Sequence, residues 1–363
     1  MEKDKLILVI NPGSTSTKIA VFKNDTCIEA SNLFHSTEEI KKASTIYGQK
    51  DMRTKGILNW IKSIKMSVND LDAVVGRGGL LRPMPGGTYK ITQKMLEDLK
   101  IGVQGQHAAN LGGIIAYDIG SKIGVPSFIV DPVAVDEFEE VARISGLPEI
   151  QRRSLVHALN INAVVRKVST KINKKFREAS YVVAHIGGGI SVAPVKNGRI
   201  IDVNNASEEG PFSAQRCGSV PADDIVCMSY SGKYTYEEMR RKVMYGSGLT
   251  AYLGTNDGRV IEKRIDEGDK KAELIFKSMA YQIGKEIGGM AAVLGGKVDA
   301  VILTGGFAYS KRITDWICDM VSFIAPVHIV PGEDEMLALA EGALRVLNNK
   351  EEFKIYEDEV FRR

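Results

Sequence analysis

The stretch that decides the fold reads KLILVINPGSTSTKIAVFKND and runs from residue 5 to residue 25. Residues 5–10 predict a buried strand, because they form a short apolar run rich in branched side chains. The polar turn NPGSTSTK follows, residues 19–22 predict a second strand, and Lys23-Asn24-Asp25 predicts a tight turn into a third strand at 26–30. The stretch therefore predicts a β-hairpin meander with a tip rich in hydroxyl groups.

The same arrangement returns at residues 181–198, which read YVVAHIGGGISVAPVKNG. An apolar strand leads into the turn GGGIS, a second strand is expected at 192–195, and KNG forms the next tight turn. When KND at 23–25 is aligned with KNG at 196–198, the two tips agree within one residue. We interpret this as an internal duplication of one domain plan. The alternative is coincidence between two common hairpins.

The rest of the chain alternates strands with helical stretches, which predicts the α/β class. A length of 363 residues leaves room for two domains. Further strands are expected at 71–75, 127–130 and 299–303, and helices at 91–99, 108–119, 155–168, 270–294 and after Gly332.

Composition excludes several classes of protein. Forty-eight basic and 45 acidic residues give a net charge of +3, which does not indicate a nucleic-acid-binding protein. The basic run at 171–177 is interpreted as a solvated surface. No apolar run approaches the roughly 18–20 residues that a membrane helix needs, and no signal-peptide core is present. The four cysteines show no metal-site spacing, so we expect free thiols and a cytoplasmic protein without a membrane partner.

Three glycine-rich turns each follow an apolar strand, at 11–17, 187–191 and 305–306. Backbone N–H groups at such turns can approach a phosphate closely, because glycine has no Cβ. Any one of them could serve the turn for steric reasons alone, but three together favour phosphate binding. None matches the P-loop or the dinucleotide-binding pattern.

The first turn adds hydroxyl donors and a charge, and other polar residues stand at predicted strand or helix ends. Magnesium keeps several waters and borrows one or two carboxylates, for which Asp131 and Glu335 are candidates, with the Asn11 amide nearby. Asp131 precedes Pro132, and we expect this to hold it in an extended, exposed geometry. A helix cap or turn is the alternative role for Asp131.

Arginines and histidines supply candidate ligands for anions. Arg77 lies between Gly76 and Gly78 after an apolar strand, and Arg216 lies in a glycine-flanked loop. A guanidinium at such a place can bind carboxylate or phosphate with two hydrogen bonds, although a surface ion pair is the alternative. His185 ends a strand just before Gly187, a favourable place for a ligand-facing histidine. His157 lies in a predicted helical stretch, where core packing is the alternative.

With these residues collected, the chain resembles the acetate kinase family, within the superfamily of acetate and sugar kinases, heat-shock chaperone ATPases and actin. Its butyrate kinase branch fits best. The matching stretches occur in the family's order and span nearly the whole chain: LILVINPGSTSTK, VVGRGGLLRPMPGG, QGQHAANLGG, SFIVDPVAVDE, RRSLVHALN, VAHIGGGISVA, EEGPFSAQRCGS, VILTGGFAYS and VPGEDEMLALAEGAL.

The resemblance implies two duplicated actin-like (ribonuclease H-like) domains with a nucleotide cleft between them. We expect residues 1–152 and 334–363 to form the first domain, with a returning C-terminal helix, and residues 153–333 to form the second, nucleotide-binding domain. The expected partners are a short-chain carboxylate or acyl phosphate and ATP or ADP, with Mg²⁺, in a homodimer or larger homo-oligomer.

The resemblance also implies roles for individual residues. The expected catalytic residues are Arg77, Asp131, His157, His185 and Arg216. The expected nucleotide and phosphate ligands are Asn11, Ser14, Ser16, Lys18, Gly187, Gly188, Gly189, Gly305 and Gly306. The expected metal ligands are Asn11, Asp131 and Glu335.

The implied reaction is butanoyl phosphate plus ADP giving butanoate plus ATP, reversibly. Two departures argue against acetate as the main substrate. Acetate kinases carry asparagine where this chain has Gly188, and a second histidine just after the His157 position, where this chain reads Ala158-Leu159-Asn160. Acetate, propionate or a branched acid remain alternatives. A nucleotide-switched binding protein of the same fold is the other alternative, but such proteins usually add a module that we do not identify here.

Overall fold

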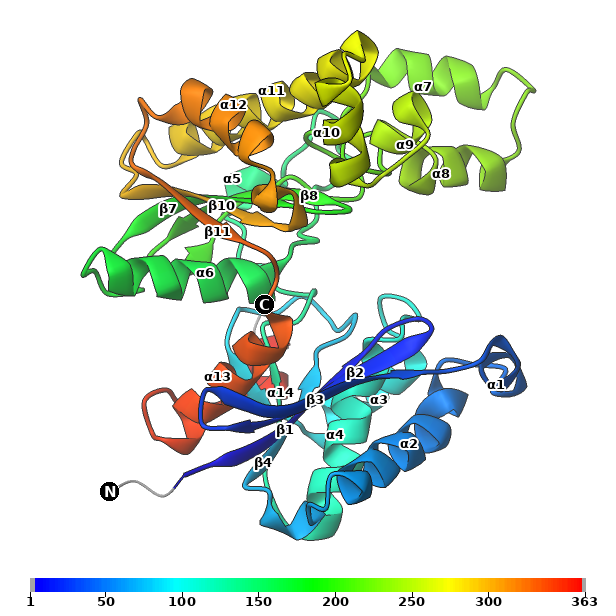
Figure 1. Ribbon diagram of the computed structural model, residues 1–363, viewed down its shortest axis with the longest axis vertical. Coiled ribbons are helices and arrows are strands. Elements are labelled where there is room, and N and C mark those ends of the chain that lie inside the picture. The colour runs from blue at the N-terminus through cyan, green and yellow to red at the C-terminus, as the bar shows by residue number, and fades with distance from the viewer. Residues whose placement is uncertain (1–3, 361–363) are drawn as a thin grey trace. The chain divides into compact units, whose positions relative to one another are not determined.

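The computed structural model describes residues 4–360, which form two units (Figure 1). The first unit is Met1–Asp136 with Asp334–Arg363, and the second is Glu137–Glu333. Residues 1–3 and 361–363, the ends of the expected first domain, lie outside the described residues. The C-terminal segment from position 334 onward groups with the first unit.

The boundary at the other side differs from the expected one, because residues 137–152 group with the second unit. The Glu137 carboxylate accepts a hydrogen bond of 2.8 Å from the backbone N–H of Ile200. Arg152 forms an ion pair of 2.9 Å with Asp202. These contacts join residues 63 and 50 positions apart, and no local sequence signal predicts them.

The first unit is built on a seven-stranded sheet with the order β12-β5-β6-β4-β1-β2-β3. β1 pairs in parallel with β4, and β4 with β6, whereas β1, β2 and β3 form the expected antiparallel meander. The strands are β1 Leu6–Pro12, β2 Ser16–Lys23, β3 Thr26–Phe34, β4 Ala73–Arg77, β5 Thr88–Lys90, β6 Ser127–Val130 and β12 Lys354–Ile355. The helices are α1 Thr37–Lys42, η1 Tyr47–Gln49, α2 Lys50–Ser63, η2 Val68–Asp70, α3 Gln93–Ile101, α4 Asn110–Ile123, α13 Glu335–Leu347 and α14 Tyr356–Val360.

Helices cover both faces of this sheet. Successive strand residues point to opposite faces. Ile129 faces Gly113 of α4, whereas Val130 faces Gly342 of α13. α4 crosses β4 so closely that a Cβ on Gly76 would lie 2.1 Å from the backbone oxygen of Gly112. Glycine at 76 therefore lets the helix lie directly on the strand that ends in Arg77.

The second unit is built on a five-stranded sheet with the order β11-β10-β7-β8-β9. The strands are β7 Ser180–Ile186, β8 Ile190–Lys196, β9 Arg199–Ile200, β10 Ala300–Gly305 and β11 Val327–Pro331. The helices are α5 Glu140–Arg143, α6 Ala158–Lys171, α7 Ala222–Ser229, α8 Tyr236–Tyr245, α9 Gly248–Leu253, α10 Gly258–Asp266, α11 Lys270–Val293, η3 Gly306–Tyr309 and α12 Lys311–Val321.

The alternation of side chains along β7 divides the second unit into two layers. Val182 and Ala184 belong to the apolar core that also contains buried residues of α11 and α12. Tyr181 and His185 point to the other face, where they contact Ser169 and Asn160 of α6. The sheet thus lies between α11 and α12 on one face and α6 on the other (Figure 1).

The two units repeat one plan, as the paired hairpins predict. The order β3-β2-β1-β4-β6 in the first unit matches β9-β8-β7-β10-β11 in the second. An aspartate precedes each central parallel strand and accepts a hydrogen bond from the first residue of the neighbouring strand, 2.9 Å from Leu6 N to Asp72 and 2.8 Å from Ser180 N to Asp299. Duplication therefore explains the chain better than two unrelated hairpins would.

The tight turns between β2 and β3 and between β8 and β9 each hold an asparagine with positive φ, 55° at Asn24 and 54° at Asn197. Asparagine tolerates this left-handed conformation better than most residues.

All four cysteines are free. No helix within residues 4–360 has the length and apolar character that a membrane crossing requires.

Candidate active site

In the first unit, three predicted site residues meet at the ends of neighbouring strands. Asn11 lies near the end of β1, Arg77 ends β4, and Glu335 begins α13. The Asn11 side-chain amide donates to Glu335 Oε2 at 2.7 Å, and Arg77 Nη1 lies 2.9 Å from Glu335 Oε1. We call Asn11, Arg77 and Glu335 the first-unit cluster. It joins residues 324 positions apart in the sequence.

The first turn follows Asn11 directly. β1 ends at Pro12 and β2 begins at Ser16, so the turn itself spans residues 13–15. Ser14 is exposed at this turn, and Lys18 is exposed on β2. The structure thus confirms the hairpin tip. Ser14, Thr15 and Lys18 are exposed, whereas Thr17 is buried.

Asp131 follows β6, but it is neither extended nor exposed, so that expectation was wrong. Its φ is +38°, and only 4% of the residue is exposed. Its carboxylate accepts a hydrogen bond of 2.7 Å from the backbone N–H of Gly87, and its own N–H donates to the Gly87 oxygen at 3.0 Å. This pairing holds Asp131 in a conformation that Pro132 disfavours. Such backbone strain gathers at functional sites.

The oxygen atoms of Asn11 and Glu335 fit a magnesium ion in chemical type, since Mg²⁺ binds carboxylate and amide oxygens. Within residues 4–360 there is no group of three histidine, cysteine or acidic side chains able to hold a metal. The Arg77 guanidinium already balances the Glu335 carboxylate. These residues therefore suit a metal ion that takes most of its ligands from water and phosphate.

In the second unit, the two predicted histidines lie against each other. Their rings stack with centroids 3.9 Å apart and planes 10° apart. His185 is buried, whereas His157 is half-buried. His157 does not lie inside a helix as expected. It precedes α6 as the N-cap residue, with ψ of 55°, and its Nδ1 lies 2.9 Å from the hydroxyl of Ser191.

Both ring nitrogens of His185 contact an acceptor. Nδ1 lies 2.9 Å from Asn160 Oδ1, and Nε2 lies 3.0 Å from Glu333 Oε1. Asn160 also accepts from the Thr304 hydroxyl at 3.3 Å and donates to the Gly332 oxygen at 3.4 Å. A single amide on α6 therefore ties together the ends of β7, β10 and β11.

The second turn, Gly187 to Gly189, contacts Arg216. A Cβ on Gly189 would lie 2.3 Å from Arg216 Nη1, whereas a Cβ on Gly188 would meet nothing within 4 Å. The Arg216 guanidinium donates to the backbone oxygen of Ala206 at 2.8 Å. Burial lowers the pKa of Arg216, but a guanidinium stays charged at neutral pH. The acceptor is a neutral backbone carbonyl and not a carboxylate, so the positive charge of Arg216 suits the binding of an anion.

The third turn requires glycine at its first position. Gly305 has φ of +89°, and a Cβ there would lie 2.5 Å from the Ile186 oxygen. Gly305 and Gly332 exchange two backbone hydrogen bonds of 3.2 and 3.0 Å. A Cβ on Gly306 would meet nothing within 4 Å, so only the first of these two glycines is required by sterics in the protein alone.

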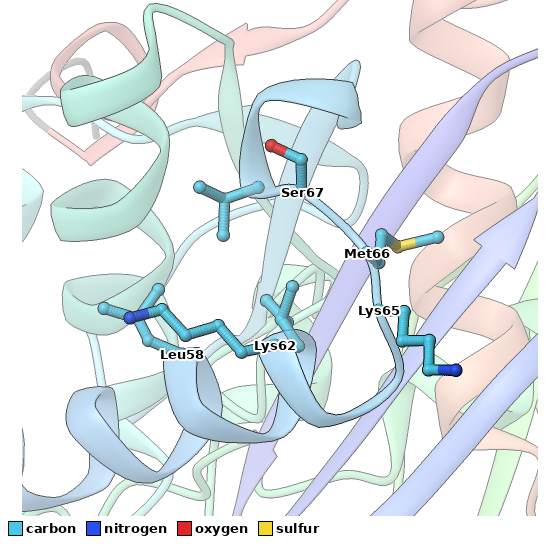
Figure 2. Close-up of a pocket in the computed structure, with 7 residues that line it drawn as sticks. Leu58, Lys62, Lys65, Met66 and Ser67 are labelled. Carbon is cyan, nitrogen blue, oxygen red and sulfur yellow. The ribbon is translucent and has the colours of Figure 1, made fainter.

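A separate surface depression of about 550 Å³ lies at the end of α2 (Figure 2). Leu58 and Lys62 come from the helix, and Lys65, Met66 and Ser67 come from the segment that follows it. None of the predicted site residues lines this depression. It therefore does not belong to the site built above.

Sequence reasoning missed several residues that hold the site together. Asn160 entered only as a departure from the family pattern, and Glu333 only as a letter of the matched stretch VPGEDEMLALAEGAL. Thr304 carried no signal beyond its place before Gly305. Their roles depend on which strand ends become neighbours, which one sequence does not state.

Comparison with known proteins gives a consistent result. Residues 149–326 match the model of the Acetokinase family. The chain is 53% identical over 350 residues to a probable butyrate kinase 2 of Caldanaerobacter subterraneus subsp. tengcongensis, covering 96% of this chain and 99% of the relative. It is 52% identical over 351 residues to butyrate kinase 2 of Clostridium acetobutylicum, with the same two coverages of 96% and 99%.

Among solved structures, the acetate kinase of Porphyromonas gingivalis has a TM-score of 0.79 and 21% identity, covering 94% of this chain and 100% of that one. A propionate kinase of Francisella tularensis has a TM-score of 0.72 and 18% identity, covering 93% and 98%. These two structures confirm the expected fold class. The similarity to the curated relatives extends over almost the whole chain, so the protein belongs to the acetokinase family.

Proposed function

We propose that the protein is a carboxylate kinase that transfers a phosphoryl group reversibly between ATP and butyrate. The observation that carries this proposal is the similarity, over 96% of the chain, to relatives named butyrate kinases. The geometry supports it, because both units place cationic and hydrogen-bonding groups beside glycine-rich turns at strand ends. Such groups suit a reaction in which both substrates are anions.

In the direction that forms the acyl phosphate, an oxygen of the ionised carboxylic acid attacks the γ-phosphorus of ATP. The new bond joins that oxygen to phosphorus, the bond to the β-γ bridging oxygen breaks, and ADP leaves with that electron pair. The nucleophile is already an anion, so no residue needs to remove a proton. The task of the protein is to position the groups and stabilise negative charge.

We assign roles on this basis. Arg77 and Arg216 bind the carboxylate or the phosphoryl oxygens, since a guanidinium offers a planar fork of N–H donors. The stacked pair of His157 and His185 lies near the transferred group, where a ring N–H of His157 donates a hydrogen bond and His185 holds the His157 ring in place. The glycine-rich turns, with Ser14, Ser16 and Lys18, bind the phosphates of the nucleotide or acyl phosphate.

The family implies Mg²⁺, which neutralises phosphate charge when it is bound. Asn11 and Glu335 would hold it, because they contact each other at 2.7 Å and carry the required oxygen atoms. Asp131 would orient this site from its pairing with Gly87. We also propose that the protein acts in the cytoplasm, as four free cysteines suggest, and that it forms a homodimer or a larger homo-oligomer.

The acid itself is tested by trapping the acyl phosphate as its hydroxamate. The purified protein is given ATP, magnesium and one acid at a time, from acetate to hexanoate and including isobutyrate. We expect the highest kcat/KM with the four-carbon acid. A maximum at acetate, propionate or isobutyrate would assign the protein to that acid instead. Absence of turnover with every acid would reject the carboxylate kinase proposal.

A further inference from the structure

A buried arginine lies beneath the first turn, and no role has yet been assigned to it. Arg53 lies in α2 and is 0% exposed. All five of its N–H groups have acceptors. Two hydrogen bonds, of 3.1 and 2.8 Å, reach Gln49 Oε1, two of 2.9 Å reach the Ser16 oxygen and the Thr17 hydroxyl, and one of 3.2 Å reaches the Ser14 oxygen.

None of these acceptors is a carboxylate. Within the described chain, no ion pair involves Arg53, although most buried charges in proteins are paired. Burial lowers the pKa of Arg53, but a guanidinium remains protonated at neutral pH. The first unit therefore keeps an uncompensated positive charge directly under the turn at residues 13–15.

The hydrogen bonds of Arg53 also set the direction of the turn. The C=O and N–H of one peptide unit lie in a plane and point in opposite directions. Because the Ser14 oxygen points toward Arg53, the N–H of Thr15 points away from it. The backbone N–H groups of Ser14 and Thr15 donate to no protein acceptor within residues 4–360, and both residues are exposed. The hydroxyl groups of Ser14, Thr15 and Ser16 likewise have no protein partner there.

A second contact fixes the same side of the turn. The Thr17 hydroxyl accepts from Arg53 and lies 2.8 Å from His35 Nε2, and the N–H of His35 donates to the Thr15 oxygen at 2.9 Å. Burial and then the charge of Arg53 lower the pKa of His35. Neutral His35 can accept the Thr17 hydroxyl proton at Nε2, which leaves Arg53 as the one cation among these contacts.

We propose that Arg53 is a positioning residue for anion binding: it aims the free N–H groups of Ser14 and Thr15 and the free hydroxyl groups of residues 14–16 outward, and it supplies the charge that a bound phosphoryl group balances. Arg53 does not touch the ligand, because it is fully buried and acts through the peptide groups of the turn. This inference rests on the proposed function only for the identity of the physiological anion.

The experiment uses the full chain with Arg53→Met, which removes the charge and the donors while filling similar volume, and Arg53→Lys, which keeps the charge but loses the planar fork. Ile57→Ala is the matched control. Ile57 is also 0% exposed, lies one helical turn further along α2 and makes no polar contact with the turn at residues 13–15. Its replacement by alanine should therefore lower the stability of the fold without changing the donors of that turn. Inorganic phosphate is the probe, and its binding is followed by the rise in melting temperature. KM for butanoyl phosphate at saturating ADP is measured in parallel.

We expect Arg53→Met to weaken phosphate binding and to raise KM by at least about tenfold, because the turn loses the group that orients its donors and the positive charge beneath it. Arg53→Lys should fall between Arg53→Met and the unmodified protein. Ile57→Ala should melt at a lower temperature but keep the phosphate-dependent rise and a KM within about twofold of the original.

Equal phosphate binding and KM in Arg53→Met and Ile57→Ala would overturn the proposal. If Arg53→Met does not fold, the same comparison is made with Arg53→Lys, for which an unchanged KM would overturn it. A protein that is not stabilised by phosphate at all would also overturn it, even if it turns over acids. Conversely, an Arg53-dependent phosphate response in a protein inactive with every acid would support this inference and reject the proposed function.

Discussion

The first and second turns occupy the same place in the two duplicated units, yet they are built from different chemistry. The first turn carries hydroxyl groups and rests on the buried guanidinium of Arg53. The second is three consecutive glycines, and its third glycine lies against the guanidinium of Arg216. One unit therefore offers side-chain donors with a charge beneath them, whereas the other offers bare backbone with a charge beside it.

The comparison shows that the two units share their strand order but differ in the residues of the first and second turns. They also share a pair of equivalent aspartates, Asp72 and Asp299, each of which accepts a hydrogen bond from the first residue of the neighbouring strand. We call this pair the shared frame. Phosphoryl transfer needs two differently shaped anion sites, one for the nucleotide and one for the acid or its phosphate. Two copies of one hairpin can supply both sites if only the tips diverge.

The largest expected effect comes from removing one polar group from either unit. Arg216→Ala and Asp131→Asn should each lower kcat at least about a hundredfold, because each removes a preorganised group from the proposed reaction site. Steady-state turnover with butyrate and ATP measures this, with circular dichroism to verify folding. Near-normal turnover in either variant would remove that residue from the site, and loss in only one unit would break the comparison.

A smaller effect separates the glycines of the second turn. Gly189→Ala places a methyl group 2.3 Å from the present position of Arg216 Nη1, so the guanidinium must move. We expect turnover to fall roughly tenfold with little change in melting temperature, since misplacing a catalytic group costs rate rather than stability.

Gly188→Ala is the matched control, because its methyl group would meet nothing within 4 Å. Its melting temperature should stay unchanged and its turnover should exceed that of Gly189→Ala. Identical turnover in the two variants would show that the turn does not depend on the contact with Arg216.

The smallest effect tests the shared frame. Burial acts to raise the pKa of Asp299, but hydrogen bonds from Lys174 and from the Ser180 N–H outweigh it and hold that pKa below its usual value. A carboxylate with a lowered folded pKa stabilises the protein above its unfolded pKa of about 4, and this contribution is lost as pH falls through the folded value. Asp299→Asn should therefore cost about 1 kcal/mol at neutral pH and less in acid.

Urea unfolding at neutral and acidic pH measures this cost. Asp72→Asn in the first unit should lower the unfolding midpoint at neutral pH by a similar amount, since Asp72 makes the same contact with Leu6. Turnover should change little in either variant. A large effect at one position and none at the other would mean that the two aspartates are not equivalent parts of a shared frame.

Much of the fold could be predicted because its signals are local. Apolar runs bounded by turns gave β1, β7 and β10, and the helix predicted at 270–294 is α11, Lys270–Val293. The sequence also identified the three residues of the first-unit cluster as candidates, because Asn11, Arg77 and Glu335 each stand at the end of a predicted strand or helix. Matched motifs placed these residues in the family's order.

The parts that could not be predicted depend on distant packing. Asp131 was expected to be extended before Pro132, but its pairing with Gly87, 44 positions away, overrides the local preference. Arg53 gives no sign in sequence that it lies under the turn at 13–15, since its partners Ser14 and Ser16 are 37 to 39 positions away. Local sequence predicts where a strand or helix lies. The contact partners of a buried side chain can be identified only once the strands are assembled into a sheet.

In the acidic tripeptide Glu333-Asp334-Glu335, three consecutive residues each make a different structural contact. Glu333 contacts His185, Asp334 caps α13 by accepting from the N–H of Leu337 at 3.2 Å, and Glu335 contacts Asn11 and Arg77. The chain also passes from the second unit to the first between Glu333 and Asp334. An inserted or deleted residue here would shift at least one of the three out of register. Over evolutionary time, descendants of this gene should change length in exposed loops such as 145–150 and keep these three positions contiguous.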